Sequence, residues 1–205
     1  MRDRREALKL LAGGTATALG ASIITTTQVH ADSGTASCLP TSWPTSLAGA
    51  LSIVRATGTN SNNDEFVRAT LNSGHSSISS IGCAGGGAPE LEVRWSATGP
   101  ITTRVLLEPG LSSASTAWVS LATGNSVRVV QQNSVEQLGT DGSYTLTLQF
   151  RAACRSPRLC WRCLTQTVTF TWDYVNGAGQ STIAANPQYG TSNDSTNCND
   201  PAPTT

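Results

Sequence analysis

Charged side chains are scarce in this sequence, and lysine is almost absent from it. Asp, Glu, Lys and Arg together make up 13% of the 205 residues, the formal net charge is zero, and Lys9 is the only lysine. A near-neutral, sparsely charged surface offers no general electrostatic attraction to nucleic acids or anionic membranes. We therefore expect no nucleic-acid partner, and a surface coated with Ser, Thr, Asn and Gln in place of ionic groups.

The sequence also lacks the patterns of common catalytic and metal sites. His75 is the only histidine after residue 31, and no Gly-x-Ser-x-Gly nucleophile elbow accompanies it. Its Ser/Gly-rich surroundings favour a solvent-facing loop over a Ser-His-Asp site. The acidic residues form no Asp-x-Asp-x-Asp-Gly calcium loop. We expect neither enzymatic activity nor a cofactor.

The apolar stretch near the N-terminus is too short to cross a bilayer and has the layout of an export signal. It covers Leu10 to Ile24, follows a basic start, and precedes Val29-His30-Ala31, where a signal peptidase would find small residues at the two positions it reads. We expect cleavage near Ala31, which leaves a mature chain from Asp32 without a transmembrane span.

Residues 4–9, Arg-Arg-Glu-Ala-Leu-Lys, resemble the twin-arginine (Tat) export motif. The resemblance implies transport in the folded state, as in bacteria and archaea; the alternative is an ordinary secretory signal. Either signal predicts a secreted or cell-surface protein. We divide the chain into a signal peptide at 1–31, a β-sandwich at 32–175 and a polar, largely irregular tail at 176–205.

The six cysteines all lie beyond the expected cleavage point: Cys38, Cys83, Cys154, Cys160, Cys163 and Cys198. An even number in an exported chain predicts three disulfides. Among the possible pairings, we expect Cys154–Cys163, Cys38–Cys83 and Cys160–Cys198. A metal or redox site that uses Cys154, Cys160 and Cys163 is the alternative, although such a site would still need a fourth ligand.

Alternation of apolar and polar residues predicts β-strands, most clearly between Asp141 and Val175. One arm alternates through Tyr144 and Phe150 and the other through Val168 and Trp172, so each arm has one buried and one wet face. The two arms predict an antiparallel hairpin whose eight-residue connection is clamped by Cys154 and Cys163.

Shorter alternating runs precede this hairpin at intervals of about ten residues. They lie at 47–57, 65–71, 91–96, 101–107, 116–121 and 126–132, separated by Gly, Pro and Asn. Together they predict an all-β fold, an antiparallel sandwich of about eight strands stapled by disulfides, with a loop-rich C-terminal tail.

Asp141-Gly142-Ser143-Tyr144 resembles the turn of immunoglobulin-like domains and the strand entry of PKD-like surface modules. The resemblance implies an immunoglobulin-like sandwich in which the Tyr144 hydroxyl ties back to the preceding corner. It also implies a core position for Trp95.

Basic side chains gather around the expected hairpin tip. Arg155, Arg158 and Arg162 lie next to Trp161, and Arg151 precedes them. Guanidinium groups beside an aromatic ring can grip a carboxylate, a phosphate or a sugar face, or dock a protein. Arg155, Arg158, Trp161 and Arg162 are therefore the candidate binding residues; the alternative is a solvated loop that keeps a sheet edge soluble.

These observations predict an exported, non-catalytic binding or structural module whose partner is a protein or glycan at the cell surface. One alternative is a filament or surface-layer subunit, a homo-oligomer in which the segment Leu47 to Val54 adds as a strand to a neighbour's sheet. A metal or redox protein built on the tip cysteines, and a secreted inhibitor or toxin with a clamped loop, are two others. Asn193-Asp194-Ser195 is the single N-glycosylation triplet.

Overall fold

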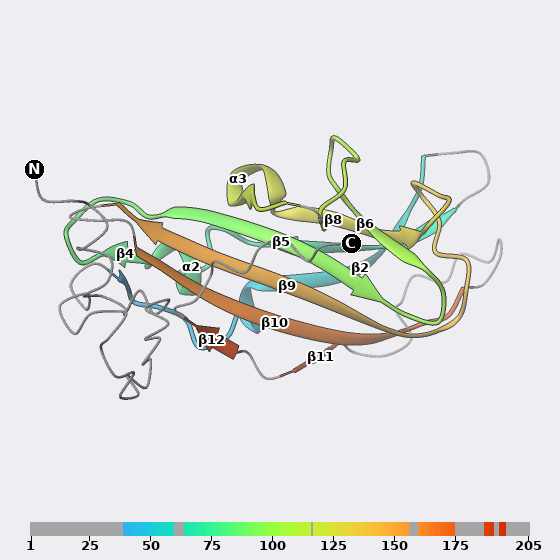
Figure 1. Cartoon of the computed structure of the whole chain (residues 1–205). Coiled ribbons are helices and arrows are strands. Elements are labelled where there is room, and N and C mark those ends of the chain that lie inside the picture. Colours follow the sequence, from blue (N-terminus) through green and yellow to red (C-terminus); the bar gives the residue numbers. More distant parts are fainter. Residues whose placement is uncertain are drawn as a thin grey trace, which may run out of the picture. The chain divides into compact units, whose positions relative to one another are not determined.

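Two antiparallel β-sheets carry most of the chain (Figure 1). The structure is a computed structural model that describes residues 39–59, 64–115, 117–155, 160–174, 187–190 and 193–195, with the backbone alone at 160 and 193–195. The expected signal peptide and its cleavage site lie outside these residues, as do Cys38, Arg158 and Cys198. Contacts assign Thr35–Thr205 to one structural unit.

The first sheet has four strands in the order β2-β3-β8-β6. Their bounds are Leu51–Thr57 for β2, Glu65–Leu71 for β3, Ser126–Gln131 for β8 and Thr103–Leu107 for β6. The expected first strand begins later than predicted, because Ala48–Ala50 form a turn of 3-10 helix (η2) and Leu47 is fully buried.

The second sheet has six strands and contains the hairpin. The order is β7-β5-β9-β10, and both β11 and β12 pair with the free edge of β10. The bounds are Val119–Ser120 for β7, Glu90–Thr98 for β5, Gly142–Cys154 for β9, Cys160–Trp172 for β10, Gln188–Tyr189 for β11 and Asn193–Ser195 for β12. The last two show that the polar C-terminal region contributes to this sheet.

A few short elements complete the described fold. They are the two-stranded pair β1 (Pro40–Thr41) and β4 (Gly82–Cys83), and the single-turn helices α2 (Ser76–Ser79) and α3 (Leu121–Gly124). Within the residues placed by the structure, no helix has the length and apolarity required to span a membrane.

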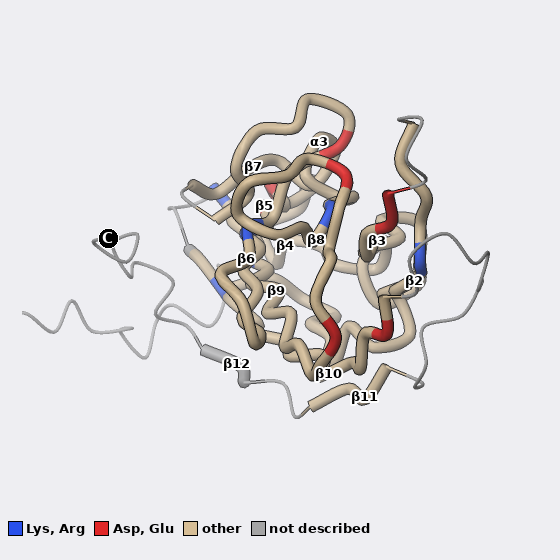
Figure 2. The backbone as a smooth tube through the Cα atoms, turned by 90° about the vertical axis from the view of Figure 1, so that its right-hand side faces the viewer, with Lys and Arg blue, Asp and Glu red and all other residues tan. Residues whose placement is uncertain are grey.

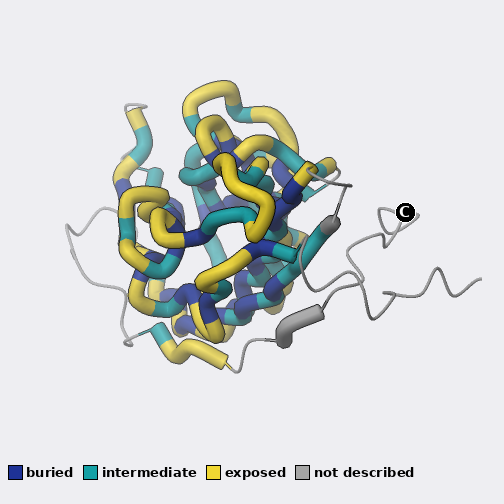
Figure 3. The backbone as a smooth tube through the Cα atoms, turned by 90° about the vertical axis from the view of Figure 1, so that its left-hand side faces the viewer, coloured by how far each residue is buried: buried dark blue, intermediate teal, exposed yellow. Residues whose placement is uncertain are grey.

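One apolar core fills the space between the two sheets. Its largest fully buried side chains include Trp95, Trp172, Tyr144, Phe150 and Phe170, which all come from the second sheet. Val67, Val105 and Val129 face them from the first sheet. Figure 3 shows the buried positions along the strands and the exposed ones mainly in the connections. The predicted all-β antiparallel sandwich is thus confirmed.

The strand order is that of a seven-stranded immunoglobulin constant-type sandwich. In such domains the first, second, fifth and fourth strands form one sheet and the third, sixth and seventh form the other. Strands β2-β3-β8-β6 and β5-β9-β10 follow the same two sequences. The Tyr144 hydroxyl donates a hydrogen bond of 2.7 Å to the carbonyl of Thr140, which is the tie to the preceding corner implied by the turn.

The hairpin strands are longer than predicted. β9 continues to Cys154 and β10 begins at Cys160, with Cys154 and Cys160 directly opposite each other in the register. The predicted eight-residue connection is therefore wrong, because Ala152 and Ala153 are buried and continue the ladder beyond the alternating segment.

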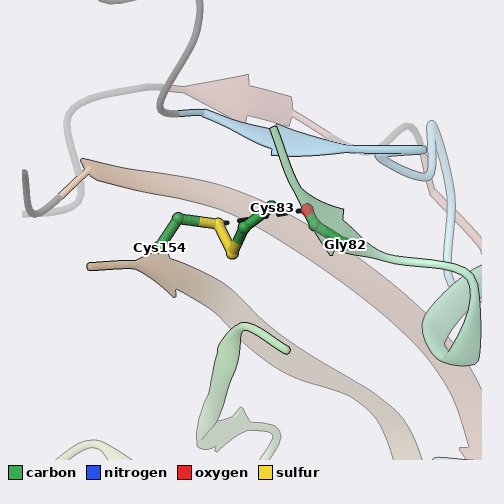
Figure 4. The surroundings of a disulfide bond; sticks show 3 residues. All are labelled: Gly82, Cys83 and Cys154. Atoms are coloured by element: carbon green, nitrogen blue, oxygen red, sulfur yellow. Dashed lines mark hydrogen bonds between the residues drawn. A yellow bond between two sulfur atoms is a disulfide. The ribbon is translucent and has the colours of Figure 1, made fainter. Parts of the chain in front are cut away.

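The disulfide at this end also differs from the prediction. Cys83 bonds to Cys154, with the Cα atoms 5.6 Å apart (Figure 4). The expected pairs Cys38–Cys83 and Cys154–Cys163 are therefore wrong. The physical reason is that β4 lies beside the end of β9, where the Sγ of Cys154 is 3.9 Å from the carbonyl oxygen of Gly82.

The edges of the two sheets are joined where β2 and β10 approach each other. Buried Gln166 accepts hydrogen bonds from the Ser46 hydroxyl and the Leu47 N–H, and it donates one of 2.7 Å to the carbonyl of Gly190. The Tyr189 hydroxyl, which follows from β11, donates to the carbonyl of Leu51 in β2. The chain before β2 and the chain around β11 are thus both fastened to β10 and to each other.

Candidate binding surface

The outward face of the second sheet brings together side chains from β5, β9 and β10. Trp95, Leu148 and Leu164 point into the core, so the residues that alternate with them point outward. Register then sets their neighbours: Arg151 lies opposite Glu92 on one side and opposite Cys163 on the other.

A cluster of arginines and tryptophans lies on this face near the hairpin tip. The guanidinium carbon of Arg151 is 4.3 Å from the ring centroid of Trp118 and 4.2 Å from that of Trp161. Arg94 lies 5.0 Å from the Trp118 centroid. We call Arg94, Trp118, Arg151 and Trp161 the arginine–tryptophan cluster. Each close cation–π contact contributes about 0.5–2 kcal/mol, depending on its desolvation.

Carboxylate and amide groups neutralise the cluster. Arg151 forms an ion pair of 2.6 Å with Glu92, and the Nε of Arg94 donates a hydrogen bond of 2.7 Å to the Oε1 of Gln149. Arg94 is 6% exposed, whereas both indoles are partly exposed. The cluster therefore presents aromatic edges and held cations, a composition enriched in the energetically dominant parts of interfaces.

Arg155 forms a separate ion pair at the tip. It donates two hydrogen bonds, of 2.6 and 2.7 Å, to the carboxylate of Glu90. The hydrogen bond from Arg155 lowers the pKa of Glu90, and the same contact raises the pKa of Arg155. Both side chains are largely exposed, at 66% and 52%, so this pair contributes little to stability.

The structure separates the predicted binding residues. Trp161 points outward and joins Arg151, whereas Arg162 lies on the opposite side of β10 with its guanidinium carbon 5.4 Å from the Trp43 ring centroid. Arg158 lies outside the described residues. Trp118 and Arg94 are part of the cluster although the sequence gave no signal for them, because only the register of β5, β9 and β10 brings them to Arg151.

A second charged group lies on the outward face of the first sheet. Glu108 accepts hydrogen bonds from Arg68, Arg128 and Ser126. The two guanidinium carbons lie 5.4 and 4.6 Å from the ring centroid of Phe66, which is fully buried beneath them. This arrangement covers an apolar ring and satisfies the charges above it, so we assign it a structural role.

The cysteines and the histidine are engaged in structural contacts. Cys154 and Cys163 are both disulfide-bonded, so neither can act as a thiolate ligand or nucleophile in this state. The Nδ1 of His75 accepts from the N–H of Ser77 and lies 2.8 Å from its hydroxyl, which caps the start of α2. Among the described residues, no group of three or more His, Cys, Asp or Glu side chains could hold a metal ion.

An open hollow lies near the Tyr144 corner at the other end of the sandwich. Its lining is mostly amide and hydroxyl: Ile101, Thr102, Gln131, Gln132, Asn133 and Thr140. These groups can accept and donate hydrogen bonds, but they include no general acid, general base or nucleophile pair.

Comparison of the whole chain with known protein families, with curated proteins and with solved structures finds no match in any of the three.

Proposed function

We propose that this chain is an exported, non-catalytic binding module that acts at the cell surface or in the surrounding medium. The signal-like N-terminus, the disulfide and the immunoglobulin-like strand order support this assignment. The observation that carries the binding role is the arginine–tryptophan cluster, because two partly exposed indoles and two arginines are concentrated on one face of a charge-poor chain.

The proposed partner contacts the tip end of this face, where Trp161 and Arg155 are accessible. Indole rings supply contact area at a low cost in conformational entropy, and arginine supplies planar hydrogen bonding to carboxylates or sugar hydroxyls. A surface protein or glycan is the partner class that fits both features.

Strand donation by the Leu47 to Val54 segment is a weaker proposal. Leu47, Leu51 and Ile53 are buried in the chain's own core, and β2 pairs along its length with β3. Donation of this segment to a neighbour would expose those side chains. An inhibitor or toxin built on a loop clamped by Cys154 and Cys163 loses its clamp, since Cys154 bonds to Cys83.

Export is tested by expressing the full chain in a bacterium with an active twin-arginine pathway. We expect the secreted form to begin near Asp32 and the double variant Arg4→Lys/Arg5→Lys to remain inside the cell. Arg2→Lys is the matched control, because it alters an arginine outside the pair. Retention of the parent chain in the cytoplasm would contradict the proposal.

Binding is tested with fluorescently labelled mature chain on the cells that export it. We expect Trp161→Ala/Arg155→Ser to lose most cell binding while its melting temperature stays close to that of the parent, because both side chains lie at the surface. Val54→Ser and Val135→Ser, which are 43% and 44% exposed on other elements, are the controls. Equal binding by all four proteins would remove this site.

A further inference from the structure

Beyond the arginine–tryptophan cluster, the outward face of the second sheet changes in character. The outward positions of β5, β9 and β10 toward the Tyr144 end carry hydroxyl side chains only: Ser96, Thr98, Ser143, Thr145, Thr147, Thr165, Thr167, Thr169 and Thr171. All of them are partly or fully exposed. We call this set the hydroxyl face.

The register arranges these hydroxyls in rows. Ser96, Thr147 and Thr167 lie opposite one another across the three strands, and so do Thr98, Thr145 and Thr169. Neighbouring strands are about 4.8 Å apart, and alternate residues along a strand are about 6.7 Å apart. The Oγ1 atoms of Thr145 and Thr169 lie 3.5 Å apart, so hydroxyls of neighbouring strands can contact each other. The result is a regular, uncharged lattice of donors and acceptors.

Threonine makes this lattice stiff. Its branched Cβ restricts χ1, so the hydroxyl and the methyl group are held in a few fixed orientations in a strand. A surface that is ordered before binding loses little side-chain entropy when a ligand settles on it. Each threonine offers one donor, two acceptors and an apolar methyl group at a fixed position.

A ligand for such a face must itself be uncharged, extended and rich in hydroxyl groups. An ionic partner would find no counter-charge among the hydroxyl rows, and an apolar partner would leave the hydroxyls without hydrogen bonds. A polysaccharide has repeating hydroxyls and C–H groups along a stiff chain, which can follow the rows. We infer that the hydroxyl face binds a neutral, extended polysaccharide.

This inference does not depend on a partner at the arginine–tryptophan cluster. The two sites lie on the same sheet but use different side chains, so variants can address them one at a time. Binding through the hydroxyl face has a further signature: because no charge takes part, retention should change little between low and high salt.

The test is a pull-down of the mature, disulfide-bonded chain with suspended cellulose, chitin and curdlan, and with calcium alginate as an anionic comparison. We expect retention on at least one of the neutral polysaccharides. The quadruple variant Thr145→Val/Thr147→Val/Thr167→Val/Thr169→Val removes four hydroxyls but keeps shape and strand preference. We expect its apparent affinity to fall at least about tenfold, because each hydroxyl supports a hydrogen bond.

Matched variants keep the test decisive. Thr57→Val/Thr70→Val makes the same change on the first sheet and should bind like the parent chain. Trp161→Ala/Arg155→Ser should also keep polysaccharide binding. If the quadruple variant melts much earlier, single Thr147→Lys and Thr167→Lys variants replace it. The inference is overturned by no retention on any neutral polysaccharide, by undiminished binding of the hydroxyl variants, or by binding only to alginate and only at low salt.

Discussion

Glu108 shows how single residues stabilise this charge-poor chain. Its carboxylate is 14% exposed and accepts hydrogen bonds of 2.7 Å from Arg68, 2.6 Å from Arg128 and 3.0 Å from Ser126. Burial by itself acts to raise the pKa of Glu108, but the hydrogen bonds from Arg68, Arg128 and Ser126 outweigh it, and the pKa is lowered. The carboxylate thus stabilises the fold in its charged form.

We expect Glu108→Gln to lower the free energy of unfolding by about 2 kcal/mol near neutral pH, because two partly buried guanidinium groups lose their counter-charge. The pKa of Glu108 is lower in the folded state than the value of about 4.3 in the unfolded chain. Its contribution is therefore complete above about pH 5 and declines as the pH falls toward the folded-state pKa. Urea unfolding at neutral and acidic pH measures this. A pH-independent difference between the two proteins would contradict it.

Glu90→Gln is the control for that experiment. The Glu90–Arg155 pair has similar hydrogen-bond distances but lies in solvent. We expect its loss to leave the unfolding transition almost unchanged.

Gly99 is required by the packing of Tyr144. A Cβ atom at Gly99 would lie 2.1 Å from the Cδ1 of the Tyr144 ring, which is fully buried and hydrogen-bonded to Thr140. We expect Gly99→Ala to destabilise the fold by about 2–3 kcal/mol, because the ring or the corner must move. Thermal unfolding measures this loss. Gly110→Ala, where nothing lies within 4 Å of the added methyl group, should be close to neutral, and equal effects at the two positions would refute the argument.

At the scale of elements, the joined edges of β2 and β10 depend on Gln166. Its amide satisfies the Leu47 N–H and the Gly190 carbonyl, on opposite sides of the same side chain. We expect Gln166→Leu to cost about 3 kcal/mol, because it leaves buried backbone groups without partners. Hydrogen exchange should accelerate at the Gly190 N–H, which bonds to the Thr167 carbonyl. Exposed Gln132→Leu is the control, and unchanged exchange at Gly190 would argue against this role for Gln166.

The alternating segments predicted the paired strands because period-two patterns report burial directly. β3 begins and ends where its pattern does, and Tyr144 forms the expected corner. The pattern could not predict the extra length of β9, since Ala152, Ala153 and Cys154 are all buried in succession. It also could not bring Trp118 to Arg151, because that contact depends on the order and register of three strands.

At the scale of the whole molecule, the few charges are used internally. The described ion pairs link Arg55 to Glu65, Arg68 and Arg128 to Glu108, Arg128 to Glu136, Arg151 to Glu92, and Arg155 to Glu90. Figure 2 accordingly shows charged residues as short, separate segments on a largely uncharged backbone. The surface between these pairs is left to hydroxyl and amide groups, which is why uncharged ligands fit it better than ionic ones.

The disulfide pattern ties the two ends of the mature chain to one strand. Cys83 and Cys154 are joined, and Cys163 is also disulfide-bonded. Cys160 cannot be its partner: the two lie three residues apart on β10, roughly 10 Å in an extended strand, and point to opposite faces. Cys163 therefore bonds to Cys38 or Cys198. We expect the remaining one of these two to bond to Cys160.

Non-reducing peptide mapping by mass spectrometry tests this expectation. Trypsin cleaves after Arg162, between Cys160 and Cys163, so each of these cysteines falls in its own peptide. We expect one linked peptide pair that contains Cys83 and Cys154, and two that connect Cys160 and Cys163 to the N-terminal and C-terminal cysteines. A Cys154–Cys163 peptide or a free thiol would contradict the structure. With the expected linkage, reduction should destabilise the fold by about 2–5 kcal/mol per bond, because it releases both ends of the chain from β10.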